Sequence, residues 1–251
     1  MRPNFSDYVE FMTEDFIEMH GDRCGTDDRA IMGGVCYIDG RPVMLIGTVK
    51  GKNTKENLTC NFGMPQPEGY RKALRLFYHA ERFNLPIVPL IDTMGAYPGI
   101  KAEETGQGIA IAENLKEMAK LTVPIIAVIT GEGCSGGALG LAVANKVYML
   151  EHAYYTVISP EACSSILYRS ADKAAEAAEA LKITSKDLLE LDVIDGEIKD
   201  PLGGAHYDPE LTASNLKSTI LKALDELSSK SGQELKDERY GKFRHMGIFQ
   251  N

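Results

Sequence analysis

Two glycine-rich segments, residues 95–99 and 131–138, each follow an apolar run that begins with Pro-Ile. Where a strand passes through glycine into a helix, the first helical turn leaves backbone N–H groups without partners, and the helix dipole favours negative charge there. The amides of Gly136 and Gly137 could therefore share one oxygen, as in an oxyanion hole for an alkoxide or enolate. Gly95 and Ala96 offer the same chemistry in the first segment.

The same glycines also have a purely structural interpretation. Glycine permits close packing of a strand against a helix, so tight turns explain either segment alone about as well as catalysis does. Two such segments after two similar apolar runs favour a functional role.

Residues 133–137 also match G-x-S-x-G, the nucleophile elbow of serine hydrolases, which makes Ser135 a candidate nucleophile. The pattern is short, and His206, the histidine that could complete it, lies in a loop-like segment, so hydrolysis is the second interpretation. The acid and base would have to come from a downstream set: Asp192, Asp195, Asp200 and His206.

Residues 50–67 are rich in Gly, Asn, Lys and Pro and are predicted to form a long loop. Lysines at 50, 52 and 55 make residues 50–55 a basic cluster, either a site for phosphates or an acidic partner or simply a solvated loop. Metal-ligand spacing is absent from the sequence, so we expect no metal site.

Composition narrows the class of protein. The 251 residues include 27 Lys and Arg against 36 Asp and Glu, a net charge of −9, so nucleic acid is not expected as a partner. The five cysteines are scattered without a C-x-x-C pair, which indicates a reducing compartment. The longest apolar runs are too short to span a membrane, so we expect a cytoplasmic protein without membrane contact.

The glycine segments must be positioned by the elements around them. Residues 86–96 and 124–134 read as strands buried on both faces, and helices are predicted over 103–121 and 135–144. Apolar strands that alternate with helices in this way predict an α/β fold.

The other elements follow from periodicity and cap residues. Thr184 or Ser185 is expected to cap a short helix, and Ser159 with Pro160 to begin another. No linker interrupts the chain, so residues 1–251 are expected to form one domain. The remaining predictions are a helix from Ser6 to Met19, a hairpin of 31–38 and 43–49 around Asp39-Gly40, helices over 68–83, 174–181 and 209–229, and an irregular tail over 234–251.

A series of short motifs also occurs in a fixed order along nearly the whole chain. They are residues 41–47, 50–51, 54–56, 61–65, 67–73, 91–93, 95–99, 131–133, 135–138, 158–161 and 201–206. In this order they resemble the carboxyltransferase α subunit of multi-subunit bacterial-type acetyl-CoA carboxylase. So many ordered matches outweigh the five-residue hydrolase pattern.

The resemblance implies a crotonase-like (ClpP/crotonase) spiral of ββα units with C-terminal helices. It implies transfer of CO2 from carboxybiotin to acetyl-CoA to give malonyl-CoA, the first committed step of fatty acid synthesis. The implied partners are a carboxyltransferase β subunit in an α2β2 heterotetramer, a biotin carboxyl carrier protein and an ATP-dependent biotin carboxylase. The α subunit is the biotin-side half, and biotin is not attached to it.

The resemblance also implies a set of site residues. The amides of Gly136 and Gly137 fall where the family binds the biotin ureido oxygen, while Gly95 and Ala96 fall where the carboxyl group lies. Carboxyl transfer needs amide-lined oxyanion sites, and because the released biotin nitrogen takes the methyl proton, no catalytic His or Ser is implied. The other residues expected to face biotin are Gly133, Ser135, Tyr97, Pro98 and Gly99.

The sequence departs from the family pattern at a few positions. Met94 stands where members have Pro, and Cys134 and Ala162 stand where they have Gly, which affects the geometry of the turns. Members also carry helical sequence ahead of the Arg2-Pro3 match, so the chain is either a naturally short or a shortened member. A biotin-dependent decarboxylase, another acyl-CoA carboxyltransferase and a purely structural subunit stay open as alternatives.

Overall fold

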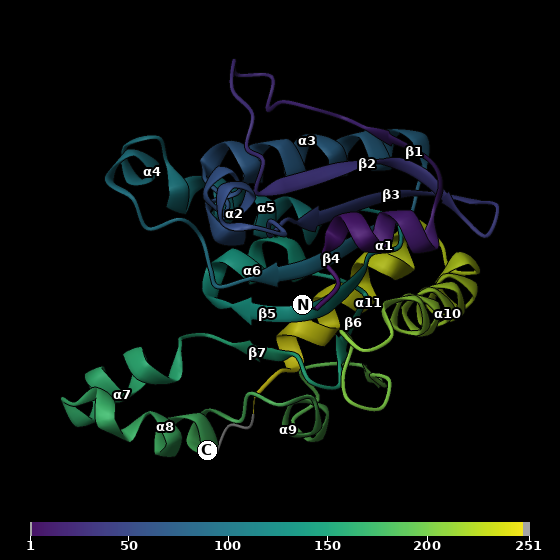
Figure 1. Ribbon diagram of the computed structural model, residues 1–251. Coiled ribbons are helices and arrows are strands. Elements are labelled where there is room, and N and C mark those ends of the chain that lie inside the picture. The colour runs from purple at the N-terminus through teal and green to yellow at the C-terminus, as the bar shows by residue number, and fades with distance from the viewer. Residues whose placement is uncertain (1, 248–251) are drawn as a thin grey trace.

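The structure, a computed structural model, describes residues 2–247 and is built on one mixed eight-stranded sheet (Figure 1). The order is β1-β2-β3-β4-β5-β6-β8, with β7 paired to β5; the first three strands are antiparallel and the rest parallel. The strands are β1 (Glu14–Glu18), β2 (Ile31–Ile38), β3 (Arg41–Thr48), β4 (Ile87–Thr93), β5 (Ile126–Cys134), β6 (Lys146–Leu150), β7 (Tyr154–Thr156) and β8 (Gly196–Ile198).

Helices cover both faces of the sheet. Gly33 leaves room for Leu76 of α3 on one face, and Gly47 leaves room for Phe5 of α1 on the other. Helices α5 and α6 lie with α3, while α10 packs beside α1 (Figure 1). The helices are α1 (Phe5–Met12), α2 (Thr54–Thr59), α3 (Pro67–Phe83), α4 (Ile100–Glu104), α5 (Gln107–Met118), α6 (Ser135–Ala142), α7 (Pro160–Tyr168), α8 (Ala174–Leu181), α9 (Ser185–Glu190), α10 (Pro209–Ser228) and α11 (Gly232–His245).

The α/β prediction is confirmed, and its strongest signals were the continuous apolar runs. Strands β4 and β5 are buried along almost their whole length because helices cover both of their faces. The predicted hairpin also forms: Asp39 and Gly40 have φ of 53° and 71°, as a two-residue turn between twisted strands requires. Ser159 and Thr184 cap α7 and α9 as predicted.

The predicted first helix from Ser6 to Met19 is wrong at both ends. Asn4 is the N-cap, because its side chain accepts from the Asp7 N–H while the Asp7 carboxylate accepts from the Asn4 N–H. The helix ends at Met12. Asp15 then has φ of 52°, and the chain continues as the edge strand β1 against β2.

Two other predictions need correction. The predicted loop over 50–67 contains α2, which Asn53 caps, followed by a 3-10 turn over Asn61–Gly63. The predicted helix over 103–121 is divided into α4 and α5, because Gly106 adopts φ of 91° between them.

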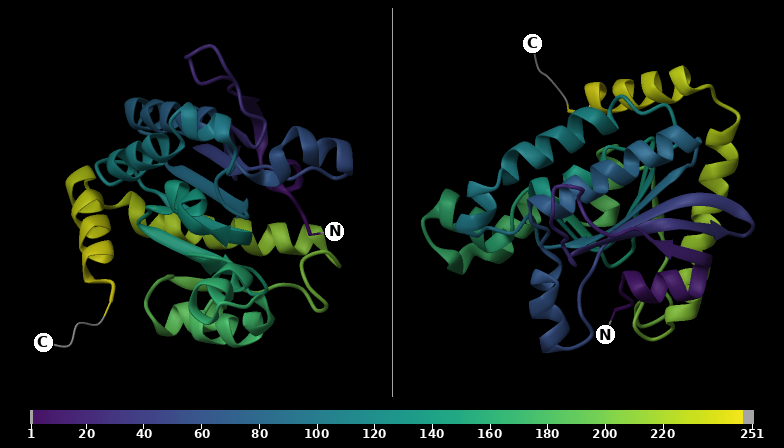
Figure 2. Two further views of the ribbon diagram at one scale, coloured as in Figure 1. Left: turned by 90° about the vertical axis from the view of Figure 1, so that its left-hand side faces the viewer. Right: turned by 90° about the horizontal axis from the view of Figure 1, so that it is seen from above.

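The predicted irregular tail over 234–251 instead forms α11 as far as His245; residues 248–251 lie outside the described part of the chain. Ser231 and Glu234 make a capping box at its start. Arg239 is fully buried and donates to the carbonyls of Met118 and Leu121 at 2.7 and 2.8 Å. These bonds fix α11, which turns away from α10, to the end of α5 (Figure 2).

Within residues 2–247, no helix is long and apolar enough to cross a membrane. The same part of the chain shows no cluster of three or more His, Cys, Asp or Glu side chains that could hold a metal ion.

Candidate active site

The two glycine segments meet at the carboxyl ends of neighbouring parallel strands. Strand β5 leads directly into α6, and β4 leads into the turn at Gly95 and Ala96. A Cβ built on Gly137 would lie 2.3 Å from the Ala96 nitrogen and 2.4 Å from the Gly95 carbonyl carbon. Only glycine at 137 therefore lets the turns touch, and the structure brings three of the four predicted catalytic residues into contact.

The start of α6 has the features of an anion site. No side chain caps this helix in the described structure, so the amides of Gly136 and Gly137 have no side-chain partner. Ser135 has φ of 61°, a left-handed conformation that costs a non-glycine residue energy and that also occurs at strained turns of active sites. A Cβ on Gly136 would meet only Ile111 Cγ2, at 3.8 Å, so the backbone there is open.

The second turn offers one free amide. The Gly95 N–H donates to Thr93 Oγ1 at 3.1 Å, and the Tyr97 N–H donates to the Pro65 carbonyl at 2.9 Å. The Ala96 N–H between them has no acceptor within residues 2–247. Of the predicted pair, Gly95 gives the turn its shape, with φ of 134°, and Ala96 has the available donor.

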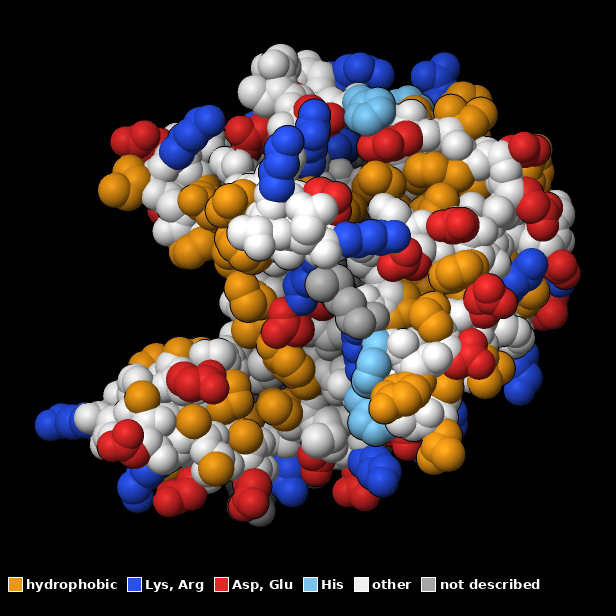
Figure 3. Space-filling model, viewed as in Figure 1, with side chains coloured by type: hydrophobic (Ala, Val, Ile, Leu, Met, Phe, Trp, Pro, Cys, Tyr) orange, Lys and Arg blue, Asp and Glu red, His pale blue; other side chains and the backbone are white. Residues whose placement is uncertain are grey.

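A mainly apolar cavity of about 320 Å³ opens beside the first turn of α6. Ser135 and Gly136 form its polar edge. Its apolar lining includes Leu139, Val157, Leu188 and Phe243. The molecule is deeply notched between the lobe of α7 and α8 and the rest of the chain, and apolar side chains gather along this notch (Figure 3).

The other predicted biotin-facing residues are distributed around these turns. Gly133 is buried in β5, where a Cβ would lie 3.0 Å from the Tyr155 ring. Gly99 caps α4, and a Cβ on it would lie 2.4 Å from the Tyr97 ring, so its lack of a side chain makes room for that ring. Pro98 is exposed.

The structure does not assemble the hydrolase triad that G-x-S-x-G suggested. His206 packs its ring against Tyr207, and neither it nor the three aspartates line the cavity beside Ser135. Asp195 accepts from the Val147 N–H, and Asp200 pairs with His152 at 2.7 Å. Within residues 2–247, the Ser135 hydroxyl has no histidine partner.

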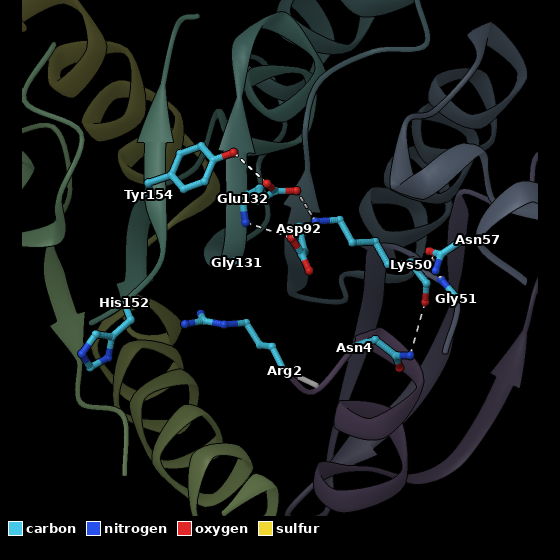
Figure 4. A pocket seen from close by; sticks show the side chains of 10 residues that line it. All are labelled: Arg2, Asn4, Lys50, Gly51, Asn57, Asp92, Gly131, Glu132, His152 and Tyr154. Atoms are coloured by element: carbon cyan, nitrogen blue, oxygen red, sulfur yellow. Dashed lines mark hydrogen bonds and ion pairs between the residues drawn. The ribbon is translucent and has the colours of Figure 1, made fainter. Parts of the chain in front are cut away.

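Sequence reasoning missed a charged cluster just before the two turns (Figure 4). The Lys50 ammonium donates to Asp92 Oδ1 at 2.7 Å and to Glu132 Oε2, and Tyr154 donates to Glu132 Oε1 at 2.9 Å. These side chains line a second cavity of about 330 Å³. Two carboxylates thus neutralise the charge of Lys50, one of the three lysines of the basic cluster.

Cys134 immediately precedes Ser135, but its thiol is not a suitable nucleophile. Burial, together with the nearby Glu132 carboxylate, raises the pKa of Cys134, and only a thiolate reacts readily. Cys24 is exposed. With iodoacetamide at pH 8 in the folded protein, we expect Cys24 to be alkylated at least about tenfold faster than Cys134. Peptide mass spectrometry measures this ratio, and equal rates would show that the turn is open to solvent.

Comparisons with known proteins agree with this geometry. The profile of the family described as "Acetyl co-enzyme A carboxylase carboxyltransferase-like" matches residues 1–247. The chain belongs to this family. It is 58% identical over 248 residues, 99% of the chain and 78% of the relative, to the acetyl-coenzyme A carboxylase carboxyl transferase subunit alpha of Geobacter metallireducens. The same subunit of a Thermus thermophilus strain is 53% identical, with 99% of this chain and 80% of the relative covered.

Solved structures share the fold at low sequence identity. Transcarboxylase 12S has a TM-score of 0.75 at 19% identity, covering 92% of this chain and 42% of that one. The Pseudomonas malonate decarboxylase MdcD-MdcE hetero-dimer has a TM-score of 0.68 at 16% identity, covering 88% of this chain and 89% of that one. The predicted crotonase-like fold and the membership in the carboxyltransferase alpha-subunit family are confirmed. The chain is therefore a transferase component of an acetyl-CoA carboxylase.

Proposed function

We propose that the chain is the biotin-side half of a carboxyltransferase that moves a carboxyl group from carboxybiotin to acetyl-CoA. The observation that carries this proposal is the contact between two amide turns from separate strands, at Gly137 and Ala96. Both turns present N–H groups without side-chain acceptors, and such groups stabilise an oxygen on which negative charge develops.

The residues present fit a biotin ring. Its bicyclic body is mostly apolar, and the cavity beside α6 is lined mainly by apolar side chains with Gly136 at its edge. The ring's ureido oxygen is polar and needs donors, which the uncapped start of α6 has. When bound, carboxybiotin supplies the carboxyl group and then a nitrogen base for the methyl proton.

Each turn then has its own task. The amides of Gly136 and Gly137 hold the ureido oxygen and stabilise charge there, while the Ala96 amide orients the carboxyl group. Gly95 shapes the second turn, and Gly137 allows the two turns to approach. The amides are fixed by the backbone before substrate binds, so little energy is spent on reorganising them.

Such a site is completed by partners. Large apolar side chains stay exposed around the notch, which is typical of an interface. We propose that a β subunit covers this surface and supplies the acyl-CoA site, in an α2β2 assembly, with a biotin carboxyl carrier protein and a biotin carboxylase as further partners. Exposed large apolar side chains of α4, α5, α7 and the segment after β7 are Ile100 at 80%, Val157 at 73%, Ile166 at 70%, Ile109 at 67% and Leu167 at 65%.

Ser135→Ala separates this function from hydrolysis. Because Ser135 has no base partner, we expect the reconstituted α–β complex to keep carboxyl-transfer activity within about threefold, whereas loss of a nucleophile costs orders of magnitude. A fluorophosphonate probe should leave the unmodified chain unlabelled. Stoichiometric labelling at Ser135 would favour the hydrolase instead.

A further inference from the structure

Strand β5 bulges just before its catalytic turn. In the pairing with β4, Ile91 lies opposite Ile129 but Thr93 lies opposite Gly133, so β5 carries extra residues between these two points. Bulges of this kind occur beside active sites, where they re-aim the chain that follows. Here the chain that follows is Ser135 and the start of α6.

The Asp92 side chain enters this bulge. Its Oδ1 accepts the Glu132 N–H at 2.8 Å, while the Asp92 N–H donates to Thr48 Oγ1 at 2.6 Å. A Cβ on Gly131 would lie 2.5 Å from Asp92 Oδ1, so only glycine at 131 admits the carboxylate. The Asp92 carboxylate therefore ties the end of β4 to the end of β5.

Lys50 joins the carboxylates of both strands. Its ammonium bonds Asp92 and Glu132, and its side chain is only 24% exposed, against 15% and 31% for its partners. The Lys50 stem lies against Gly63, where a Cβ would come within 2.8 Å of Lys50 Cγ. Tyr154 holds the other oxygen of Glu132 from β7, at 2.9 Å.

The two carboxylates that Lys50 bonds lie close in sequence to the two amide turns. Two residues separate Asp92 from Gly95, and two separate Glu132 from Ser135. We propose that Lys50, Asp92 and Glu132 form a positioning cluster that sets the distance between the Gly95–Ala96 turn and the Ser135–Gly137 turn. The inference rests on the proposed function, because it concerns the same amides. In this proposal the side chains of Lys50, Asp92 and Glu132 do not contact the substrate.

Lys50→Met tests the proposal, because it keeps an unbranched apolar stem and removes the ammonium. In the α–β complex we expect kcat for carboxyl transfer to fall by about 10- to 100-fold, since small misplacements of catalytic groups cost about that much. KM for acetyl-CoA should stay within about twofold. Asp92→Asn, which keeps an oxygen for the Glu132 N–H, should give a smaller loss of the same kind and serves if Lys50→Met does not fold.

Lys146→Met is the matched control. Lys146 is 18% exposed, bonds Glu226 at 2.7 Å, and pairs with Ile126 at the opposite end of β5. The Lys146→Met variant should lower the melting temperature by about as much as Lys50→Met does, while its kcat stays within about twofold of the unmodified complex. Equal kcat losses in the two variants would reduce the cluster to a general stability element and overturn the proposal.

Hydrogen exchange gives a readout that does not depend on activity. In Lys50→Met, the peptide covering 126–138 should exchange faster, because the Asp92 carboxylate that accepts the Glu132 N–H is no longer held in place by the Lys50 ammonium. Lys146→Met should not accelerate exchange near Glu132, and unchanged exchange in Lys50→Met would contradict the proposal. A fully active Gly136→Pro complex would instead refute the proposed role of the amides, so the two failures are distinguishable.

Discussion

Gly136→Pro is expected to lower the carboxyl-transfer rate of the α–β complex by about 10²–10³, or roughly 2.7–4 kcal/mol, the usual loss for one oxyanion-hole donor. Proline at 136 removes the backbone N–H of that residue and leaves the N–H groups of Gly137 and Ala96 in the chain. Position 136 lies in the first turn of α6, where that N–H has no acceptor within the helix. Because proline also disfavours the left-handed φ of 61° at Ser135, a crystal structure of the variant must show that the turn is kept.

Gly136→Ala is the control for this variant. It adds a Cβ, which would meet only Ile111 at 3.8 Å, and it keeps the amide, so activity should stay within a few fold. Melting temperature and β-subunit binding must be measured for both variants. Substitution of Gly137 is a poorer test, because a Cβ there would strike the backbone of Ala96 and change packing and catalysis together.

The purified chain alone should form no malonyl-CoA above background, and adding the β subunit should restore transfer. In the proposal this chain binds carboxybiotin, and the β subunit holds acetyl-CoA within bonding distance of it. Holding both reactants together converts a bimolecular step into a fast intramolecular one. Exposed apolar side chains such as Ile100 on α4 and Ile166 on α7 are available for that association.

Two variants check that association governs the activity. Ile166→Asp places a charge on a side chain that is 70% exposed and that does not line the cavity beside α6, and it should weaken subunit binding and activity together, with little change in melting temperature. Leu202→Asp, at a side chain that is fully exposed and belongs to no element, should change neither. Malonyl-CoA formation from carboxybiotin by the chain without its partner would contradict the half-site account.

The central strands and their turns could be predicted because their signals are local. Strands β4 and β5 are continuous apolar runs, the β2–β3 hairpin has Asp39-Gly40, and α3 shows helical periodicity. The first helix was misjudged because Phe16 fits helical spacing from Met12 as well as it fits an edge strand. Helix α11 could not be predicted because its sequence is polar and has no apolar stripe. It is held by Arg239, whose carbonyl partners lie 121 and 118 residues earlier in the chain, so no local pattern indicates them.

In the candidate site too, the features with a local sequence signal could be predicted, and those that depend on distant residues could not. The glycines of both turns could be found because a glycine between a strand and a helix has few roles. That the Gly95 amide is occupied, and that Ala96 has the free donor, depends on the Thr93 hydroxyl and could not be read from the residue types. The positioning cluster joins residues separated by 42 and 82 positions, Lys50 with Asp92 and with Glu132, so no local pattern could reveal it.

A crystal structure of the α–β complex with biotin bound tests the central claim most directly. The account predicts the ring in the apolar cavity beside α6, with its ureido oxygen about 2.7–3.1 Å from the nitrogens of Gly136 and Gly137. The Ala96 N–H should face the ring nitrogen that carries the carboxyl group. A ring bound elsewhere, or a ureido oxygen turned away from α6 in a complex that still transfers carboxyl groups, would contradict the account.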